Sequence, residues 1–374
     1  MVRSFEQPKM ALCLITAAIL LLVFSPRSWG AAADEWKKVV EAAKKEGKVV
    51  VSIPASSELR KQMEPIFEQR FPGIDLELHS GTASAMQRKI SDEFAAGVRY
   101  FDLHMGGAVT MINGFVGGQI VDPIEPNLLL PEVIDAKNWW GGHMAVDKEK
   151  RFTYLFSAFL VASFWHNTKL ANATELRSYD DLLNPKWKGK IGWLDPRQPG
   201  AGLGVWEYMW KHKGEDYLKR LVTQDLQLSR DQRVMAESLA REKWAVTIGV
   251  SHYSYRSFVS AGLPVSPLPI FKEGTYGTAG SGILAIIKNR PHPNATKVFV
   301  NWLLGKEGQE VWTKSMSQPT RRRDVDTEWT AKFGSIAAKD NVSVEKWNEV
   351  EQISADGEAL ANAAANGARR LLPN

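Results

Sequence analysis

Two α/β lobes are the fold that this sequence predicts, from the alternation of its elements, its length and two long apolar runs. Between residues 48 and 105, short apolar runs alternate with stretches of helical periodicity, which is typical of a parallel sheet. The chain has 374 residues, more than one hydrophobic core usually organises, so we expect two cores. The apolar runs at 154–165 and 280–287 are expected to be strands that leave the first lobe and return to it.

The first lobe is expected to begin with an amphipathic helix and a buried strand. Residues 34–46 place apolar side chains at helical spacing and stop at Gly47, a residue type that often caps a helix C-terminus. Residues 48–53 have the β-branched composition of a strand buried on both faces, as in a parallel sheet. Pro54 is expected to end this strand.

Two helix and strand units continue the first lobe. Ser56 and Ser57 can cap the helix that follows them, and a strand is expected at 74–78. A second helix is expected to start in the polar turn at 80–84, before a strand at 100–105. The resulting β-α-β-α-β order indicates a parallel sheet.

The second lobe is expected to repeat this kind of alternation. Its predicted elements are a strand at 191–195, helices at 202–212, 216–222 and 231–242, and a strand at 244–248. Two lobes joined by two crossing strands leave a cleft between them, and such a hinge can close on a ligand.

The N-terminus has the pattern of a secretory signal peptide. Arg3 and Lys9 precede an uncharged apolar run at 10–24, and small residues follow at 30–33. The run is shorter than the roughly 20 residues that a membrane-spanning helix needs, so we expect cleavage near residues 30 to 33 and a periplasmic location. Cys13, the only cysteine, lies within this run, so the mature protein would contain no thiol.

The charge balance argues against a nucleic-acid partner. Removal of residues 1–30 leaves 44 basic and 41 acidic residues, a formal charge of +3, and the basic residues are scattered among acids. The short run Arg321-Arg322-Arg323 is expected to be a solvated face or a docking patch. We therefore divide the chain as follows: 1–30 signal peptide, 31–160 first part of lobe 1, 161–278 lobe 2, and 279–374 the return to lobe 1 with C-terminal helices.

Four stretches resemble the bacterial extracellular solute-binding protein family 1, in particular its ferric iron ABC-transporter periplasmic components. They are residues 46–51, 67–74, 179–191 and 301–309, and the third contains the specific run Asp-Leu-Leu-Asn-Pro-Lys-Trp-Lys-Gly-Lys-Ile. The resemblance implies a type II periplasmic binding fold with a two-strand hinge. It also implies a monomeric protein that captures a small ligand and delivers it to an ABC permease in the inner membrane.

The resemblance raises the question of a ferric iron site, since iron binders of this family use two adjacent tyrosines after a strand of the second lobe. The matching stretch at 249–256 reads Gly-Val-Ser-His-Tyr-Ser-Tyr-Arg, so the adjacent pair is absent. A set of His252, Tyr253 and Tyr255 remains an expected candidate, because ferric iron favours phenolate and imidazole donors. Any Fe3+ would be the transported ligand, and no resident cofactor is expected.

A rival expectation is an anion site, for a carboxylate, a phosphorylated solute or an anionic ferric chelate. Hydroxyls and glycines lie where strands end and helices begin, and helix N-termini favour anions. Arg230 could pair bidentately with the anion or form a salt bridge with Asp231 or Glu237; Trp193 could form an aromatic wall. The candidate ligand-binding residues are Ser56, Ser57, Thr82, Ala83, Gly107, Trp193, Asp195, Arg230, Ser251 and Tyr253. Ser56 and Ser57 also fit a role as helix caps alone.

Other classes of function remain as alternatives. The sequence has no G-x-S-x-G elbow, no H-E-x-x-H motif, no P-loop lysine and no paired-glycine dinucleotide fingerprint, so we do not expect an enzyme. A ligand-loaded sensor that docks on a membrane receptor would have the same sequence features as an importer component.

Overall fold

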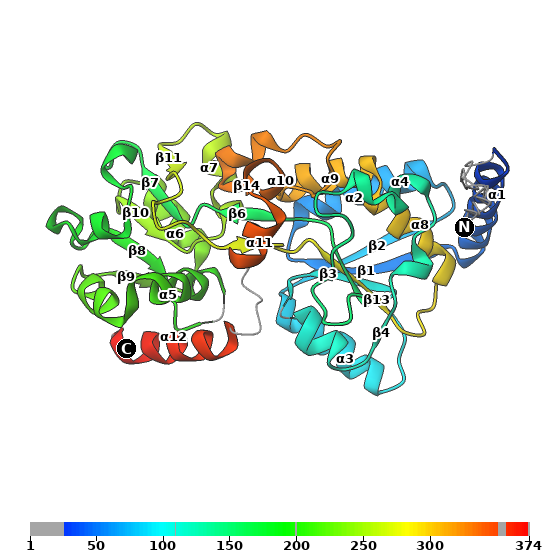
Figure 1. Ribbon diagram of the computed structural model, residues 1–374, viewed down its shortest axis with the longest axis horizontal. Helices are drawn as coiled ribbons and strands as arrows, with labels where there is room; N and C mark the ends of the chain where they lie inside the picture. Colours follow the sequence, from blue (N-terminus) through cyan, green and yellow to red (C-terminus); the bar gives the residue numbers. More distant parts are fainter. Residues whose placement is uncertain (1–25, 109, 199, 351–356, 373–374) are drawn as a thin grey trace, which may run out of the picture.

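Two α/β lobes lie side by side in the computed structural model, which describes residues 26–108, 110–198, 200–350 and 357–372 (Figure 1). Each lobe has its own larger sheet, and a three-stranded sheet lies between them. The predicted α/β fold with two lobes is confirmed. The predicted signal peptide lies almost wholly outside the described residues, and no helix within them is long and apolar enough to cross a membrane.

Lobe 1 is built on a mixed sheet with the strand order β2-β1-β3-β13-β4, in which β5 also pairs with β13. β1 runs parallel to β2 and β3, and β13 returns antiparallel beside β3. The strands are β1 (Lys48–Pro54), β2 (Asp75–Gly81), β3 (Leu103–Gly106), β4 (Val121–Asp122), β5 (Thr153–Leu155) and β13 (Ile283–Ile287). The helices are α1 (Pro26–Glu46), α2 (Ser57–Arg70), α3 (Ala83–Ala95), the π-helix η1 (Thr110–Val116), α4 (Pro131–Ile134), α8 (Pro293–Leu304) and α9 (Lys306–Met316).

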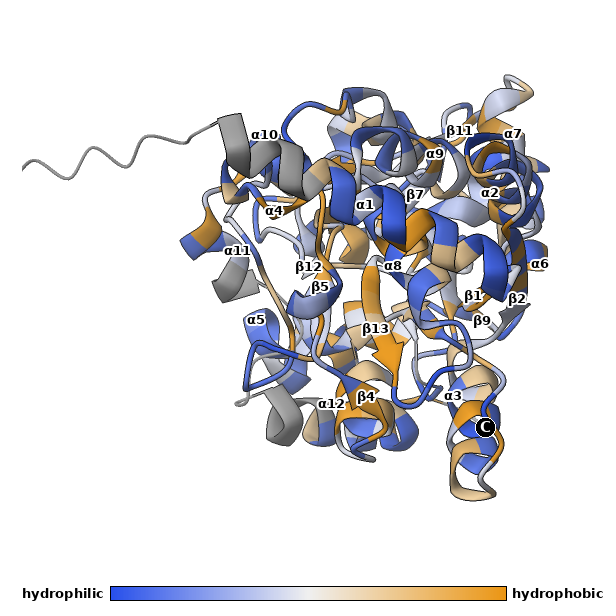
Figure 2. Ribbon diagram, turned by 90° about the vertical axis from the view of Figure 1, so that its right-hand side faces the viewer, coloured by the Kyte–Doolittle hydropathy of each residue, from blue (hydrophilic) through white to orange (hydrophobic). Residues whose placement is uncertain are grey.

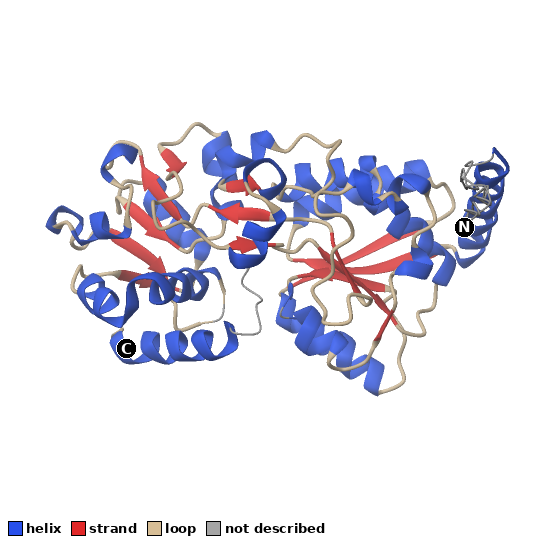
Figure 3. Cartoon of the chain, viewed as in Figure 1, coloured by secondary structure: helices blue, strands red, loops and turns tan. Residues whose placement is uncertain are grey.

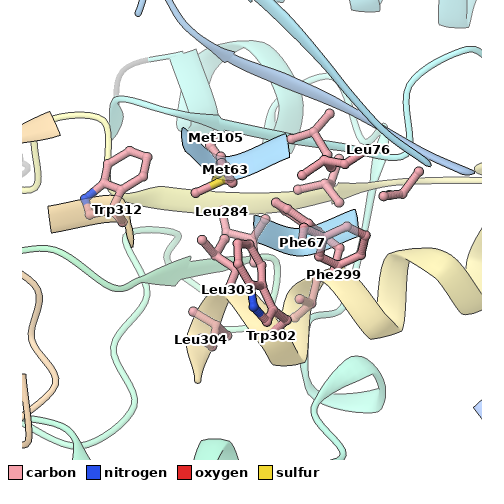
Figure 4. Packing of buried hydrophobic residues seen from close by; sticks show 14 of the residues in the cluster. Met63, Phe67, Leu76, Met105, Leu284, Phe299, Trp302, Leu303, Leu304 and Trp312 are labelled. Atoms are coloured by element: carbon pink, nitrogen blue, oxygen red, sulfur yellow. The ribbon is translucent and has the colours of Figure 1, made fainter. Parts of the chain in front are cut away.

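Both faces of the lobe 1 sheet are covered, as the β-branched run of β1 predicts. Val49 and Val51 belong to one buried cluster, whereas Val50 belongs to the cluster on the opposite face. Figure 4 shows the first cluster, in which Phe67 of α2 packs against Phe299 of α8 with ring centroids 5.6 Å apart. β13 is apolar along its length, as its colour in Figure 2 shows, because it lies in the middle of this doubly covered sheet.

Lobe 2 has the strand order β11-β7-β10-β8-β9. Its elements are β7 (Phe164–Asn167), β8 (Ile191–Leu194), α5 (Ala201–Val222), β9 (Gln227–Ser229), α6 (Gln232–Ala240), β10 (Val246–Ile248), the 3-10 helix η7 (His252–Tyr255), α7 (Arg256–Ser260) and β11 (Val265–Pro267). The helices predicted at 202–212 and 216–222 form the single element α5, which is interrupted where Gly214 adopts φ 75° and ψ 179°. Glycine adopts this conformation without steric cost, so the chain changes direction there.

The hinge is the three-stranded sheet of β6 (Phe159–Val161), β12 (Gly277–Thr278) and β14 (Ser335–Ala337). β12 and β14 each pair antiparallel with β6, so the predicted hinge is confirmed and gains a third strand, but its second crossing strand is β12, whereas the run predicted at 280–287 forms β13 of the lobe 1 sheet. The single strand predicted at 154–165 is instead β5, β6 and β7, each in a different sheet. Ser157 and Ser163, the two polar residues of this run, lie where the chain passes from one sheet to the next.

The C-terminal helices join both lobes. After η8 (Glu328–Phe333) come α10 (Ala338–Asn341), α11 (Val344–Val350) and α12 (Gly357–Leu371). Trp347 of α11 packs with Trp140 of lobe 1, with ring centroids 6.2 Å apart. α12 packs on α5 of lobe 2, where the Trp206 Nε1–H donates to the Ala364 carbonyl over 2.9 Å. The chain therefore passes between the lobes a further time before its end.

Two of the three consecutive arginines were expected at the surface and are in the interior. Arg321 and Arg322 are buried, and only Arg323 is exposed. The guanidinium of Arg321 donates to the backbone carbonyls of Leu155, Trp140 and Gly142. The prediction of a solvated face or docking patch is therefore wrong for Arg321 and Arg322, because these side chains satisfy buried carbonyls.

Candidate functional site

The carboxyl ends of the parallel strands face the region between the lobes, which separates the two larger sheets (Figure 3). In lobe 1, Pro54 pairs with Gly81 at the ends of β1 and β2. In lobe 2, Leu194 pairs with Ser229, so the next residues, Asp195 and Arg230, lie at one edge. Ligands of open α/β sheets bind at this kind of edge, which makes these two edges the candidate site.

A carboxylate shared by two arginines gives the lobe 2 edge its charge. Asp195 is 3% exposed, and its carboxylate accepts from Nε of Arg197 at 2.8 Å and from Nε of Arg230 at 3.1 Å. Burial alone would favour the neutral acid, but the hydrogen bonds from Arg197 and Arg230 lower the pKa of Asp195 to about 2. One carboxylate and two guanidinium groups give this cluster a net charge of +1, and the neighbouring Asp231 carboxylate is engaged in capping α6.

Arg230 presents that positive charge to solvent. Its side chain is 69% exposed, and its ion-pair partner is Asp195, not the predicted Asp231 or Glu237. Within the described part of the chain, neither terminal nitrogen of the Arg230 guanidinium donates a hydrogen bond to protein. Asp195 was predicted as a ligand residue, but its oxygens are occupied by the arginines, so its contribution is to orient Arg230.

The N-terminus of α5 lies at the same edge, which the sequence did not indicate. Gly200 precedes α5 without a side-chain cap. A Cβ on Gly202 would lie 2.0 Å from the Leu194 carbonyl oxygen, and a Cβ on Gly249 would lie 2.6 Å from the Gly202 Cα. These glycines allow the first turn of α5 to approach the ends of β8 and β10, and the positive end of its dipole adds to the charge of Arg230.

Ser251 and Tyr253 lie beside the first turn of α6. Gln232, a residue missed by the sequence analysis, accepts from the Ser251 backbone N–H at 2.8 Å. Its side-chain amide also donates to the Tyr253 hydroxyl at 3.4 Å. Tyr253 is 51% exposed, so of the predicted residues in this stretch it is the one whose ring is open to solvent.

The predicted metal residues His252, Tyr253 and Tyr255 do not converge on one point. Tyr255 is buried, stacks on Trp165 with ring centroids 4.0 Å apart, and hydrogen-bonds Thr247 through its hydroxyl. Burial raises the pKa of Tyr255, which disfavours the phenolate that ferric iron requires. In the described ranges, no group of three His, Cys, Asp or Glu side chains is arranged to hold a metal ion.

His252 joins lobe 2 to lobe 1. Its ring packs on Phe159 of the hinge with centroids 5.6 Å apart, and its Nε2 lies 3.4 Å from the Met316 carbonyl oxygen at the end of α9. Arg256 adds a second bond across this junction, from its guanidinium to the Ser315 carbonyl at 2.7 Å. The geometry therefore gives His252 a role at the junction of the lobes.

Trp193 was expected as an aromatic wall and lies in the core of lobe 2. It is buried, its Nε1–H donates to the Gly202 carbonyl at 3.2 Å, and its ring lies 5.4 Å from that of Trp206. This expectation is wrong, because β8 is buried on both faces and its tryptophan has no route to solvent.

The lobe 1 candidates cap helices at the opposite edge. The Ser56 and Thr82 hydroxyls accept from the N–H groups of Leu59 and Ala85, at 3.1 and 3.4 Å. These are the bonds of N-caps, and they leave the exposed first residues of α2 and α3, Ser57 and Ala83, beside the region between the lobes. Gly107 closes this edge, where a Cβ would lie 3.4 Å from the Gly280 carbonyl oxygen.

The outer edge of the lobe 1 sheet carries a groove of a different kind. It lies along β2, which is an edge strand. Glu68 and Glu64 of α2 accept from the backbone N–H groups of Leu76 and Leu78, at 3.3 and 3.1 Å. These carboxylates accept hydrogen bonds from N–H groups of the edge strand that could otherwise pair with a strand of another chain. The glutamates along the groove therefore protect the sheet edge.

The buried histidine at the lobe junction predicts acid lability. Burial lowers the pKa of His252 from 6.5 to about 4, so the unfolded chain takes up a proton in this range and the folded chain does not. The contribution of His252 to the free energy of unfolding is therefore complete above pH 6.5 and is lost as the pH drops towards 4. The loss amounts to about 2 to 3 kcal/mol at pH 4.5. Urea unfolding of wild type and His252→Gln at pH 7.5 and 4.5 measures this loss.

The His252→Gln variant distinguishes the effect of His252 on stability from that of the carboxylates, which titrate in the same pH range. His252→Gln should lose less stability than wild type on acidification, whereas His79→Gln, at a partly exposed site, should follow wild type. Equal acid sensitivity in all three proteins would contradict the assignment to His252.

Solved structures with low sequence identity share this two-lobe fold. Iron-bound HitA from Pseudomonas aeruginosa superposes with a TM-score of 0.63 at 17% identity, over 87% of this chain and 99% of that one. Trichodesmium IdiA (FutA), in complex with iron and citrate, superposes with a TM-score of 0.61 at 17% identity, over 87% of this chain and 99% of that one. AfuA from Actinobacillus pleuropneumoniae, with fructose-6-phosphate bound, superposes with a TM-score of 0.59 at 22% identity, over 86% of this chain and 99% of that one.

Sequence comparison supplies the family. An uncharacterised protein of Haemophilus influenzae is 29% identical over 139 residues, which are 36% of this chain and 39% of that protein, so the match spans well under half of the relative. The family model described as bacterial extracellular solute-binding protein matches residues 32–310, most of the chain. The chain therefore belongs to the bacterial extracellular solute-binding protein family.

Proposed function

We propose that this protein is the solute-capturing component of an ABC importer and that its solute carries an anionic group bound at the lobe 2 edge. The observation that carries the proposal is the exposed Arg230 guanidinium, held in place by the buried Asp195 carboxylate. The predicted signal peptide supports export to the periplasm, where a monomeric, non-enzymatic protein would load and then dock on its permease.

The chemistry of the edge favours an oxyanion. The Nε–H of Arg230 is used by Asp195, so its two terminal nitrogens are left to bind a phosphate or carboxylate. Such charge-assisted hydrogen bonds contribute about 1.5 to 3 kcal/mol each. The first turn of α5 and the Tyr253 hydroxyl lie at the same end of the lobe and supply further donors.

The solutes named for the similar structures fall partly in this class. AfuA holds fructose-6-phosphate, and IdiA holds iron together with citrate. A phosphorylated solute or an anionic ferric chelate would suit Arg230, whereas direct coordination of Fe3+ would need ligands that Tyr255 does not offer. The short strands β6 and β12 support closure of the lobes around such a solute.

A thermal-shift screen of the mature protein tests the proposal. The probes are inorganic phosphate, citrate, ferric citrate and fructose 6-phosphate, with neutral fructose as the matched control. A probe at 100 times its dissociation constant should add about 2.7 kcal/mol of stability. Stabilisation by fructose equal to that by fructose 6-phosphate, or by none of the anions, would contradict an anion site.

Ferric iron distinguishes an anionic chelate from a tyrosine-bound metal. With ferric citrate, Tyr253→Phe and Tyr255→Phe should leave the visible absorbance of the protein unchanged, because Tyr255 is buried and its hydroxyl bonds Thr247. Visible absorption spectra of wild type and both variants measure this. A charge-transfer band that either substitution removes would establish tyrosine coordination and overturn the preference for an anion.

A further inference from the structure

Two buried polar side chains lie beneath the lobe 1 edge in an otherwise apolar layer. Ser52 of β1 and His104 of β3 are buried and pair across the sheet, with the Ser52 Oγ 2.8 Å from the His104 Nδ1. The imidazole also packs edge-on to Phe115 of η1, with ring centroids 4.8 Å apart. Burial of polar groups at such a place has a cost unless each of them is hydrogen-bonded.

The hydrogen bond to Ser52 fixes the tautomer of His104. Burial lowers the pKa of His104 to about 3, so the ring is neutral and carries one N–H. The Ser52 hydroxyl has no other partner in the described residues, so donation by Nδ1 would leave both the hydroxyl hydrogen and Nε2 unpaired. Donation by the hydroxyl to Nδ1 leaves a single unpaired group, the Nε2–H.

That unpaired N–H points towards the candidate site. The His104 Nε2 is buried and has no hydrogen-bond partner. An ideal Cβ on Gly106, two residues closer to the edge, would lie 2.4 Å from this atom, so the ring extends along β3 to the strand end. Gly106 and Gly107 place no side chain between the imidazole and the first turns of α2 and α3. An unsatisfied buried donor needs an acceptor, and this edge is where one can arrive.

We propose that His104 is a solute-recognition residue of lobe 1, whose Nε2–H donates to an oxygen of the bound solute at Gly106 and Gly107. This assignment deepens the proposed function and rests on it: Arg230 holds the anionic group, and His104 recognises a second, oxygen-bearing group on the same molecule. Because Arg230 already holds the anionic group and a neutral N–H needs no charge on its acceptor, we assign this second group as a hydroxyl or carbonyl oxygen. The solute class is therefore a hydroxylated phosphate or a hydroxy acid.

Nitrogen NMR of the full mature protein with 15N-labelled histidine tests the assignment. The expected result is a neutral ring protonated at Nε2, whose 15N and 1H resonances shift with fructose 6-phosphate and less with inorganic phosphate. His166, whose Nδ1 bonds the Ala171 carbonyl at 2.8 Å, is the internal control and should not move. An Nδ1-protonated ring, or a His104 resonance that neither probe moves, would overturn the assignment.

Affinity measurements give a second, independent readout. His104→Phe and Ser52→Ala should weaken fructose 6-phosphate binding roughly threefold to tenfold and leave inorganic phosphate binding unchanged, because a neutral hydrogen bond is lost. Wild-type affinity in both variants would refute the role of His104. The proposed function would survive that result, since it fails when no anionic probe binds or when fructose binds as well as fructose 6-phosphate.

Discussion

Arg321→Met should lower the free energy of unfolding by about 3 to 5 kcal/mol. The substitution removes the donors to the carbonyls of Leu155 and Trp140, which are buried, and of Gly142, which is partly buried. Each orphaned buried group costs about 1 to 3 kcal/mol, and removal of a buried charge returns part of that cost. Methionine keeps most of the volume of the side chain, so cavity formation contributes little. Urea denaturation at pH 7.5 measures the change.

The neighbouring Arg323 supplies a matched control. Its side chain is exposed, and its backbone N–H donates to the Asn138 carbonyl, a bond that a substitution leaves intact. Arg323→Met should therefore change stability by less than about 0.5 kcal/mol. If both substitutions had the same effect, the buried hydrogen bonds of Arg321 would not be the source of stability.

The elements of lobe 1 could be predicted because local pattern and tertiary environment agree there. β1 is a β-branched run buried on both faces, and the helix after it has the predicted cap Ser56, whereas the next helix is capped by Thr82, which was not predicted as a cap. The run at 154–165 was predicted as one strand because its apolar residues follow one another almost without a break; only Ser157 and Ser163, which lie between the three strands, could have marked the changes of sheet. The break between the helices predicted at 202–212 and 216–222 agrees with the kink of α5 at Gly214.

The sequence could predict that the candidate site lies at strand ends, but not which side chains pair there. The sequence placed Asp195 at a strand end and Arg230 before a helix, but their ion pair joins residues 35 positions apart and depends on the register of β8 and β9, a strand that was not predicted. The sequence did not show that Trp193 and Tyr255 are buried. Burial decides whether an aromatic ring can contact a ligand, and it is set by tertiary packing. His104 was not among the predicted site residues, because its role follows from the unpaired nitrogen beside Gly106, which no sequence pattern shows.

Arg230→Ala should weaken binding of an anionic probe by about 2 to 4 kcal/mol, or roughly thirty- to a thousandfold. Asp195 keeps its bond to Arg197 in the variant, so the carboxylate stays paired and the fold should be retained while the excess positive charge is lost. Calorimetric titration with fructose 6-phosphate measures the change. The affinity of Arg230→Lys for fructose 6-phosphate should lie between those of wild type and Arg230→Ala, since lysine keeps the charge and loses the bidentate geometry.

Arg241, at the other end of α6, is the control for net charge. It is exposed and pairs with Glu237 at 2.6 Å, so Arg241→Ala removes the same formal charge far from the strand ends. Surface charges are screened over about 8 Å at physiological salt, so this variant should bind within twofold of wild type. Equal losses in Arg230→Ala and Arg241→Ala would show that the probe responds to overall charge alone. A loss confined to Arg230→Ala would place the anionic group at the edge that Asp195 and Arg230 form, because only there does the substitution remove donors that the solute contacts.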